Sequence, residues 1–366
     1  MDETGRSPVI LVLAPNWLGD VVMASPLLSR LAAAHDGRGR GPAVQLAVRR
    51  AWAPLFAGDP RLAAVVEVER PGRHAGVRGL GRLAAQLRRV GADAVVLGPP
   101  SLRAALVSRL AGVPLRIGYR GDGRRFLLSG ALRRPIRGER HHGDELLDLG
   151  DRALAACGLK PGDPERERGW GLLPGCTASP AADPGPGPPL WVLAPGTTYG
   201  EAKVWPVANA ARFVDLAVGA RGVRLVLLGD SGAAGFAAAL RERCAGPWRP
   251  GTAGPAGIVD LVGRTTVAEA ATLLRRAEAF VGNDSGLMHL AGALGVPTVG
   301  LFGSTDPAWT APLGPRVRPL AADGFPCRPC FRRTCNQERF CLETIGADVV
   351  LEAVDSLVAA AGKEMP

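Results

Sequence analysis

The sequence predicts an α/β protein that consists of two doubly wound domains. Three observations support this prediction: the chain has 366 residues, short apolar runs alternate with longer helical patterns, and one stretch near the middle is rich in Pro and Gly. A chain of this length usually forms more than one core. Strands that alternate with helices are typical of parallel βαβ units. We therefore expect two similar domains that face each other across a cleft.

Residues 1–172 are expected to form the N-terminal domain. Its first strand is predicted at Pro8–Ala14, followed by a loop and a helix from about Asp20 to His35. The other elements expected here are strands at Val44–Val48, Ala63–Val68 and Ala92–Leu97 and helices near Leu80–Val90, Leu102–Leu110 and Asp144–Cys157. The last of these helices is expected to end the domain.

Proline and glycine recur throughout residues 173–189. Such a segment forms neither a helix nor a central strand, so we expect it to link the domains. The C-terminal domain is expected at residues 190–346, followed at 347–366 by a closing helix, Ala347–Ala361, and a tail. Inside this domain the pattern predicts strands at Leu190–Ala194, Val223–Leu228, Ala279–Val281 and Thr298–Leu301 and helices at Pro206–Val218, Ala233–Arg243, Thr266–Arg276 and Gly286–Leu294.

The net charge of +10 is concentrated in the N-terminal domain. Residues 1–172 contain 27 Lys and Arg against 17 Asp and Glu, whereas residues 173–366 contain 17 of each kind. A basic half attracts anionic partners. Nucleic acid, an anionic membrane surface and a phosphorylated substrate all fit this charge, as does a basic surface that serves only solubility.

The sequence also bears on where the protein works. No apolar run approaches the roughly 20 residues that span a bilayer, and the N-terminus does not lead from a basic region into an apolar signal stretch. We therefore expect a cytoplasmic protein that can touch the inner membrane from inside. In that reducing compartment the seven Cys are not expected to form structural disulfides.

The segment Gly282–His289 (GNDSGLMH) follows a predicted strand and starts a predicted helix. Asp284 or Ser285 can cap that helix, Gly286 allows a ligand close to the backbone, and the free amides of the first turn suit a diphosphate. His289 lies one turn beyond Ser285 on the same face, where it either reaches a phosphate or makes an internal contact. A plain helix cap is the alternative, but the hydroxyl, the glycine and the histidine together favour an anion site.

A second loop after a predicted strand contains Gly196, Thr197, Thr198 and Lys203. Threonine hydroxyls and main-chain amides can bind phosphate, and a lysine adds a point charge. Lys203 is one of three Lys among 44 basic residues, which favours a specific role over a solvated surface charge. A third loop, Gly303–Pro307, places small hydroxyl residues beside glycine, although alone it is typical of a turn. Three such loops at one sheet edge predict a nucleotide-diphosphate site.

Asp20 is the acidic residue that directly follows the first predicted strand. It can be the general base that takes a proton from an acceptor hydroxyl, or it can cap the following helix, and the two roles are compatible. Asp230 lies in a glycine loop, Gly229–Gly235, that faintly resembles a dinucleotide motif but lacks the fitting acidic residue about 20 positions later. We therefore exclude a nicotinamide site and expect at most a nucleoside contact at Asp230.

Four cysteines lie close together in a loop rich in Pro and Arg, at Cys327, Cys330, Cys335 and Cys341. Their number matches the ligand count of a tetrahedral zinc or an iron–sulfur site, although the second pair is more widely spaced than in a zinc ribbon. A structural metal, reduced free thiols and a redox disulfide all fit the pattern.

Three motifs taken together resemble family 9 glycosyltransferases, which include lipopolysaccharide heptosyltransferases. They are Asn16–Pro26 (NWLGDVVMASP), the Pro-Gly-Thr segment that leads to Lys203–Pro206 (KVWP), and Asn283–His289 (NDSGLMH). The resemblance extends, in order, from about Pro8 to Ala361. It implies a GT-B fold, in which two Rossmann-like doubly wound domains face a central cleft.

The resemblance further implies a reaction. L-glycero-D-manno-heptose would pass from ADP-heptose onto an inner-core heptose of lipopolysaccharide, with inversion and with no cofactor required for catalysis. Asp20 would be the base, and Lys203 and the helix amides would stabilise the charge on the departing ADP. The donor-binding residues would be Thr197, Thr198, Lys203, Asp284, Ser285, Gly286 and Leu287, with His289 beside them.

One departure from the family concerns the nucleoside. Family members carry an acidic residue for the ribose a few positions after the Gly229 loop, where this chain has none. Either Asp230 takes that role or the nucleoside is held differently, so a related transferase with another donor or acceptor is the alternative. A nucleic-acid-binding or metal-sensing module would need a basic recognition helix or an aromatic-studded sheet. The sequence shows neither, and nucleic acid is not expected as a partner.

Overall fold

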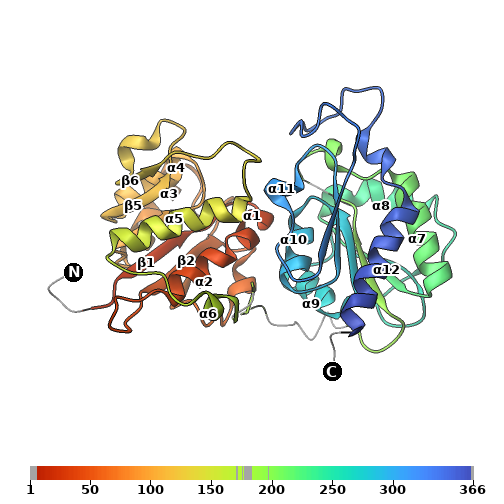
Figure 1. The fold of residues 1–366 in the computed structure, drawn as a ribbon, viewed down its shortest axis with the longest axis horizontal. Helices are drawn as coiled ribbons and strands as arrows, with labels where there is room; N and C mark the ends of the chain where they lie inside the picture. Colours follow the sequence, from red (N-terminus) through yellow and green to blue (C-terminus); the bar gives the residue numbers. More distant parts are fainter. Residues whose placement is uncertain (1–5, 170–171, 175, 177–183, 197, 364–366) are drawn as a thin grey trace. The chain divides into compact units, whose positions relative to one another are not determined.

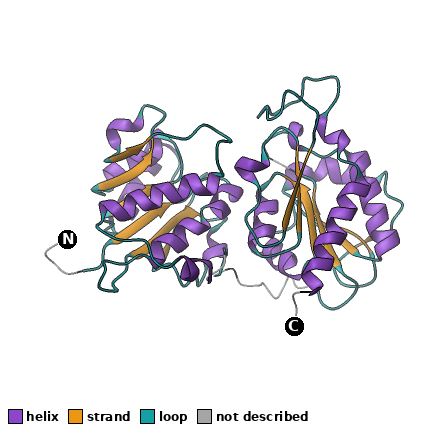
Figure 2. Ribbon diagram, in the orientation of Figure 1, coloured by secondary structure: helices purple, strands orange, loops and turns teal. Residues whose placement is uncertain are grey.

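A computed structural model of the chain describes residues 6–169, 172–174, 176, 184–196 and 198–363 (Figure 1). The chain divides into two compact units, Met1–Cys176 and Thr177–Pro366. The boundary falls inside the expected linker, residues 173–189, of which 175 and 177–183 lie outside the described residues. In each unit helices flank a sheet of parallel strands (Figure 2).

The N-terminal unit contains a six-stranded parallel sheet in the order β3-β2-β1-β4-β5-β6. The order reverses between β1 and β4, and doubly wound sheets bind ligands outside the carboxyl ends of the strands at such a switch point. The sequence pattern missed β5 and β6, because β5 (LRIGY) interrupts its apolar run with a charge and a glycine. The strands are β1 (Val9–Leu13), β2 (Ala43–Arg49), β3 (Ala64–Val68), β4 (Ala94–Leu97), β5 (Leu115–Tyr119) and β6 (Gly130–Leu132).

The helices of this unit correct two expectations. The single helix expected from Asp20 to His35 is broken at Ala24, because Pro26 in the first turn of the second helix has no amide hydrogen with which to continue the ladder. Asp144–Cys157 is not the last helix, since another follows. The helices are α1 (Leu18–Met23), α2 (Ser25–Ala33), α3 (Gly76–Arg88), α4 (Leu102–Leu110), α5 (His142–Ala156) and α6 (Pro164–Gly169), with short 3-10 turns η1 (Ala53–Phe56) and η2 (Arg124–Leu127).

The C-terminal unit contains a seven-stranded parallel sheet in the order β13-β12-β11-β7-β8-β10-β9. Its switch point lies between β7 and β11, whose residues are buried throughout. The sequence pattern missed β9, β10 and β13. The strands are β7 (Leu190–Ala194), β8 (Arg224–Leu227), β9 (Trp248–Arg249), β10 (Gly257–Asp260), β11 (Ala279–Asn283), β12 (Thr298–Phe302) and β13 (Val317–Ala321).

The helices of the C-terminal unit agree more closely with the sequence pattern. α9 begins with a capping box, in which the Thr266 hydroxyl accepts from the Glu269 amide and the Glu269 carboxylate accepts from the Thr266 amide. The final helix buries Val350 and Val354 in the core of this unit. The helices are α7 (Val207–Arg221), α8 (Ala234–Arg241), α9 (Val267–Arg276), α10 (Gly286–Ala293), α11 (Pro307–Thr310) and α12 (Ala347–Lys363), with 3-10 turns η4 (Glu201–Lys203), η5 (Ser231–Ala233) and η6 (Cys341–Thr344).

An aromatic cluster in this core fixes the loop that follows β7. Trp205 is fully buried, its ring centre lies 6.1 Å from that of Phe213, and Phe213 in turn lies 6.2 Å from Trp191. The Trp205 indole donates a hydrogen bond of 2.8 Å to the Ile345 carbonyl. These contacts therefore fix the position at which the loop after β7 ends. None of the described helices is long and apolar enough to cross a membrane.

Candidate functional site

Asp284 is the centre of a buried polar cluster at the carboxyl end of β11. Its carboxylate lies 2.5 Å from the Lys203 ammonium and accepts hydrogen bonds from the hydroxyls of Thr305 (2.7 Å) and Thr310 (3.4 Å). His289 Nε2 lies 3.6 Å from the other carboxylate oxygen. The cluster thus joins residues of three loops, which follow β7, β11 and β12, at one edge of the sheet.

The charge state of Asp284 follows from these neighbours. The side chain is 4% exposed, and burial opposes its ionisation. The contact with His289 and the charge of Lys203 outweigh that effect and hold the pKa of Asp284 well below its usual range. Lys203 also lies over the ring of Tyr199, with its nitrogen 4.5 Å from the ring centre. The pair is therefore a fixed Asp–Lys ion pair rather than a solvated lysine.

Asn283 connects the β11 strand end to the β7 loop. Its side-chain oxygen accepts from the Trp205 amide at 3.0 Å, and its side-chain NH₂ donates to the Pro195 carbonyl. One buried amide thereby fixes both ends of the loop that carries Lys203. Neither Asn283 nor Thr310 was among the predicted site residues, although Asn283 stands next to Asp284 in the motif.

The start of α10 faces outward from this cluster. Ser285 occupies the N-cap position, and Ser285, Gly286 and Leu287 are partly exposed, whereas Met288 and His289 are buried. The first amides of a helix have no partner within the helix and carry its positive end. Among the described residues His289 Nδ1 is buried without a hydrogen-bond partner, a cost that a bound ligand can offset.

The remaining predicted donor and nucleoside residues, Thr197, Thr198 and Asp230, lie outside this buried cluster or outside the described residues. Thr198 is exposed, and Thr197 lies outside the described residues. Asp230 follows β8, is exposed, and accepts a hydrogen bond of 3.0 Å from the Gly232 amide, so it caps the 3-10 turn η5. The structure brings Lys203, Asp284 and His289 together, but it does not join Asp230 to that group.

The Cys-rich loop 327–341 is hydrogen-bonded to the loops that follow β7 and β12. The Arg328 guanidinium donates to the carbonyls of Gly303 (2.5 Å) and Thr305 (3.2 Å), and the Phe331 amide donates to the Ser304 carbonyl at 2.8 Å. On the β7 side, the Arg333 carbonyl accepts from the Ala202 amide at 2.9 Å. The loop therefore fastens the β7 and β12 loops to each other.

A structural metal, one of the three interpretations of Cys327, Cys330, Cys335 and Cys341, is not supported. All four side chains line one hollow, but within the described part of the chain no group of three or more His, Cys, Asp or Glu residues could hold a metal ion. The physical reason is that Cys341 packs into the hydrophobic core at the start of η6, whereas Cys327 and Cys335 are exposed. Burial raises the pKa of the Cys341 thiol, which disfavours the thiolate that a metal needs.

The N-terminal unit presents Asp20 at its own switch point. Asp20 lies in the first turn of α1, directly after β1, and is half-buried. The N-terminus of α5 lies beside α1, since a Cβ atom on Gly143 would be 3.4 Å from the Met23 carbonyl. Asp20 is therefore one helical turn from the residue that α5 contacts.

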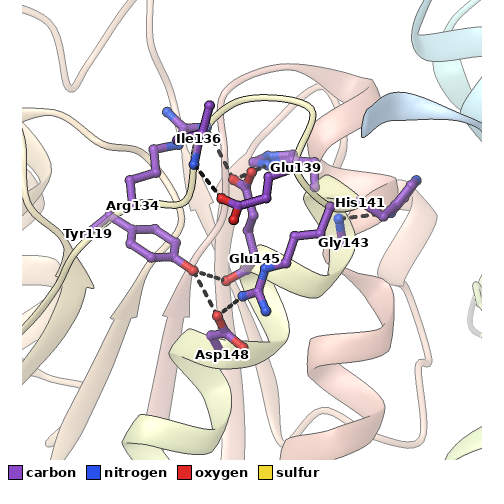
Figure 3. Close-up of polar contacts among 10 residues, drawn as sticks. Tyr119, Arg134, Ile136, Glu139, His141, Gly143, Glu145 and Asp148 are labelled. Carbon is purple, nitrogen blue, oxygen red and sulfur yellow. Dashed lines mark hydrogen bonds and ion pairs between the residues drawn. The ribbon is translucent and has the colours of Figure 1, made fainter. Parts of the chain in front are cut away.

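A polar network ties the loop before α5 to that helix (Figure 3). Glu145 is fully buried in the first turn of α5, where its carboxylate lies 2.9 Å from His142 Nδ1 and 3.4 Å from Arg134. The Tyr119 hydroxyl, at the end of β5, donates to the Glu145 carbonyl at 2.7 Å and lies 3.4 Å from an Asp148 carboxylate oxygen. The network fixes the Arg134 guanidinium at the carboxyl edge of the N-terminal sheet.

Solved structures share the fold of this chain. The structure of E. coli ADP-heptose lipopolysaccharide heptosyltransferase II superposes with a TM-score of 0.71 at 24% identity, over 97% of this chain and 99% of that chain. A second heptosyltransferase from E. coli, solved with ADP-2-deoxy-2-fluoro heptose, gives a TM-score of 0.66 at 18% identity, over 95% of this chain and 99% of that one. The fold is GT-B, and the protein is a glycosyltransferase.

Sequence comparisons give the family. The model of glycosyltransferase family 9 (heptosyltransferase) matches residues 80–340, and the chain belongs to this family. It is 30% identical to lipopolysaccharide heptosyltransferase 1 of Pseudomonas aeruginosa, over 90% of this chain and 88% of that protein. It is 27% identical to lipooligosaccharide heptosyltransferase 2 of Haemophilus influenzae, over 84% and 87%. A WCX domain model also matches residues 44–113, which lie within the N-terminal sheet unit.

Proposed function

We propose that this protein transfers L-glycero-D-manno-heptose from ADP-heptose onto a heptose in the inner core of lipopolysaccharide, with inversion and without a catalytic metal. Family membership supports heptosyl transfer, and the ADP-heptose analogue bound to a solved relative supports the donor. The observation that carries the proposal is the buried Asp284–Lys203 pair beside the open N-terminus of α10.

The donor would bind at the start of α10. Amides of Gly286 and Leu287 suit the diphosphate, since they combine free N–H groups with the positive end of the helix. The Lys203 ammonium has three N–H donors, and its described contacts with Asp284 involve the carboxylate and the main-chain carbonyl. Its remaining donor and the hydroxyls of Thr197 and Thr198 would stabilise the charge that develops on departing ADP.

The acceptor would bind at the N-terminal unit. Asp20 would take the proton from an acceptor hydroxyl as that oxygen attacks the anomeric carbon of the donor heptose. The bond from this carbon to the diphosphate oxygen breaks on the opposite face, which inverts the configuration, and ADP leaves with the electron pair. The basic character of residues 1–172 suits an anionic acceptor.

A second candidate function is transfer from a different nucleotide sugar. The observation that favours it concerns the residue that would bind the ribose. Asp230 is the only acidic side chain in the loop after β8, and its carboxylate already caps η5. A donor screen that measures nucleotide release distinguishes the two functions. ADP-heptose should be the preferred donor with a heptose-terminated core acceptor, and preference for UDP- or GDP-sugars would favour the second candidate.

The catalytic assignment is tested with Asp20→Asn. Loss of a general base typically slows a reaction by about 10²–10⁴-fold, so transfer should fall by that much while donor binding persists. Asp348→Asn is a matched control, because Asp348 also lies in the first turn of a helix but is 67% exposed and paired with Arg212. Activity of Asp20→Asn equal to that of the control would remove Asp20 from the mechanism. Activity in the presence of a chelator tests metal independence on the same samples.

We also propose that the enzyme works in the cytoplasm and associates peripherally with the inner membrane, where a lipid-linked acceptor would be found. The charge excess of the N-terminal half supports this proposal. Co-sedimentation with vesicles that contain anionic lipid, at low and high salt, measures the association. Equal binding to neutral vesicles would contradict it.

A further inference from the structure

Trp17 is an unusual exposed aromatic residue beside the proposed base. Its side chain is 58% exposed, whereas the other tryptophans in the described ranges are buried or half-buried. It occupies the N-cap position of α1, and Asp20 is the third residue of that helix. In a capping box the side chain at the third helical position reaches back to the main-chain amide of the N-cap residue. The exposed indole ring and the carboxylate that would act on the acceptor are therefore carried by the same turn of the chain, at its N-cap and third helical positions.

The exposure of Trp17 does not result from a loose loop. The preceding carbonyl, that of Asn16, accepts hydrogen bonds of 3.3 Å from Arg49 Nη1, at the end of β2, and from the indole of Trp52, at the start of η1. On the other side Pro15 is buried against β4, where a Cβ atom on Gly98 would lie 2.7 Å from the proline ring. Both neighbouring strands thus fix the loop, and the indole faces solvent from a rigid base.

We propose that Trp17 is an acceptor-binding residue, whose indole ring packs against the C–H face of the acceptor sugar and presents one of its hydroxyls to Asp20. This inference rests on the proposed function. A sugar ring has an apolar C–H face and a polar rim, and an indole has a flat apolar surface with an electron-rich face. Arg49 lies at the end of β2, where its guanidinium is 5.8 Å from the Trp52 ring centre. It can hydrogen-bond to the hydroxyls on the polar rim of the sugar.

A protein partner explains this surface less well. Protein-binding sites present contiguous apolar patches, but the large exposed apolar side chains of this unit are distributed over separate elements. Val77 lies on α3, Leu102 and Leu110 at the two ends of α4, Phe126 on η2 and Ile136 in the loop before α5. A single aromatic ring beside a carboxylate suits a small ring-shaped ligand such as a monosaccharide.

The experiment measures transfer from ADP-heptose to a delipidated, heptose-terminated core oligosaccharide, with each substrate varied in turn. Removal of an aromatic anchor should raise the KM for the acceptor in Trp17→Ala by about tenfold, with the KM for ADP-heptose within about twofold. Trp17→Phe, which keeps an aromatic ring, should recover most of the acceptor affinity. Phe126→Ala, at an exposed aromatic residue on another element, is the matched control and should behave as the native enzyme.

A second readout does not depend on turnover. Titration of the acceptor into the native enzyme should change the indole fluorescence, and the same titration of Trp17→Phe should lose that change. An acceptor KM that is unchanged in Trp17→Ala, or that changes only with intact lipopolysaccharide in vesicles, would overturn the inference while leaving the proposed function intact. Absence of transfer by the native enzyme would instead overturn the proposed function, and this inference with it.

Discussion

Asp284→Asn is expected to destabilise the C-terminal unit, because it leaves the Lys203 ammonium buried without its counter-ion. The two side chains are 4% and 11% exposed. Removal of one partner from a buried ion pair costs about 3–5 kcal/mol. Asparagine keeps the shape of the side chain and can still accept from the Thr305 hydroxyl, so the lower end of that range, about 3 kcal/mol, is expected.

Calorimetry of the full chain measures this loss. In units of the size of Thr177–Pro366, 1 kcal/mol corresponds to a shift of about 2–4 °C in the thermal midpoint. The C-terminal transition should therefore fall by roughly 6–12 °C, while that of the N-terminal unit stays in place. Asp348→Asn removes an exposed ion pair in the same unit and should cost at most about 1 kcal/mol.

A double mutant isolates the charge effect. Lys203→Met in the Asp284→Asn background removes the stranded ammonium, so it should recover part of the lost stability even though it changes a second buried residue. Two outcomes would refute the reasoning. One is a midpoint for Asp284→Asn within about 2 °C of the native value. The other is a double mutant whose loss equals the sum of the two single losses.

Three further predictions concern pH, thiol reactivity and the N-terminal core. The pKa of Asp284 is lowered in the folded state. The ionised side chain therefore contributes its full stability above about pH 4, and this contribution is lost on acidification. In denaturant titrations, the difference in unfolding free energy between the native chain and Asp284→Asn should narrow below that pH. Burial raises the pKa of Cys244 to about 12, so iodoacetamide at neutral pH should alkylate the exposed Cys327 at least about tenfold faster by mass spectrometry, and equal rates would contradict this. Arg61→Ala strands a fully buried carboxylate and should cost about 3–5 kcal/mol in urea denaturation, against at most about 1 kcal/mol for the 69% exposed Arg50→Ala.

Several of the strands that the sequence predicted consist of an uninterrupted apolar run in the interior of a sheet, whereas β3 (AVVEV) is an edge strand that was predicted from its first three apolar residues. β7 (LWVLA) and β4 (AVVL) are buried at every position and are readable for that reason. β13 (VRPLA) lies at a sheet edge, where Arg318 and Pro319 are tolerated because one side of the strand needs no partner. Edge strands of this kind resemble loops in sequence, and they were missed.

The candidate site was predictable residue by residue but not as an assembly. Each loop carried its own signal, so Lys203, Asp284 and His289 could be chosen from strand ends and helix starts. The pairing of Lys203 with Asp284 could not be predicted, because the two residues are 81 positions apart in the sequence. They are brought together because β7 and β11 are neighbours in the sheet. Thr310 carries no local signal for the role that it has, since its hydroxyl reaches Asp284 only after α11 folds back.

The hydrogen bonds made by the Cys-rich loop have a consequence for engineering. Loops at the edge of a doubly wound sheet usually tolerate exchange one at a time. Here Arg328 and Phe331 form hydrogen bonds to the main chain after β12, and the Arg333 carbonyl accepts a hydrogen bond from the main chain after β7. A chimaera that imports either of those loops from a homologue without residues 327–341 should misalign both. The loop after β7, the loop after β12 and residues 327–341 therefore form one structural unit, which should be exchanged between homologues as a whole.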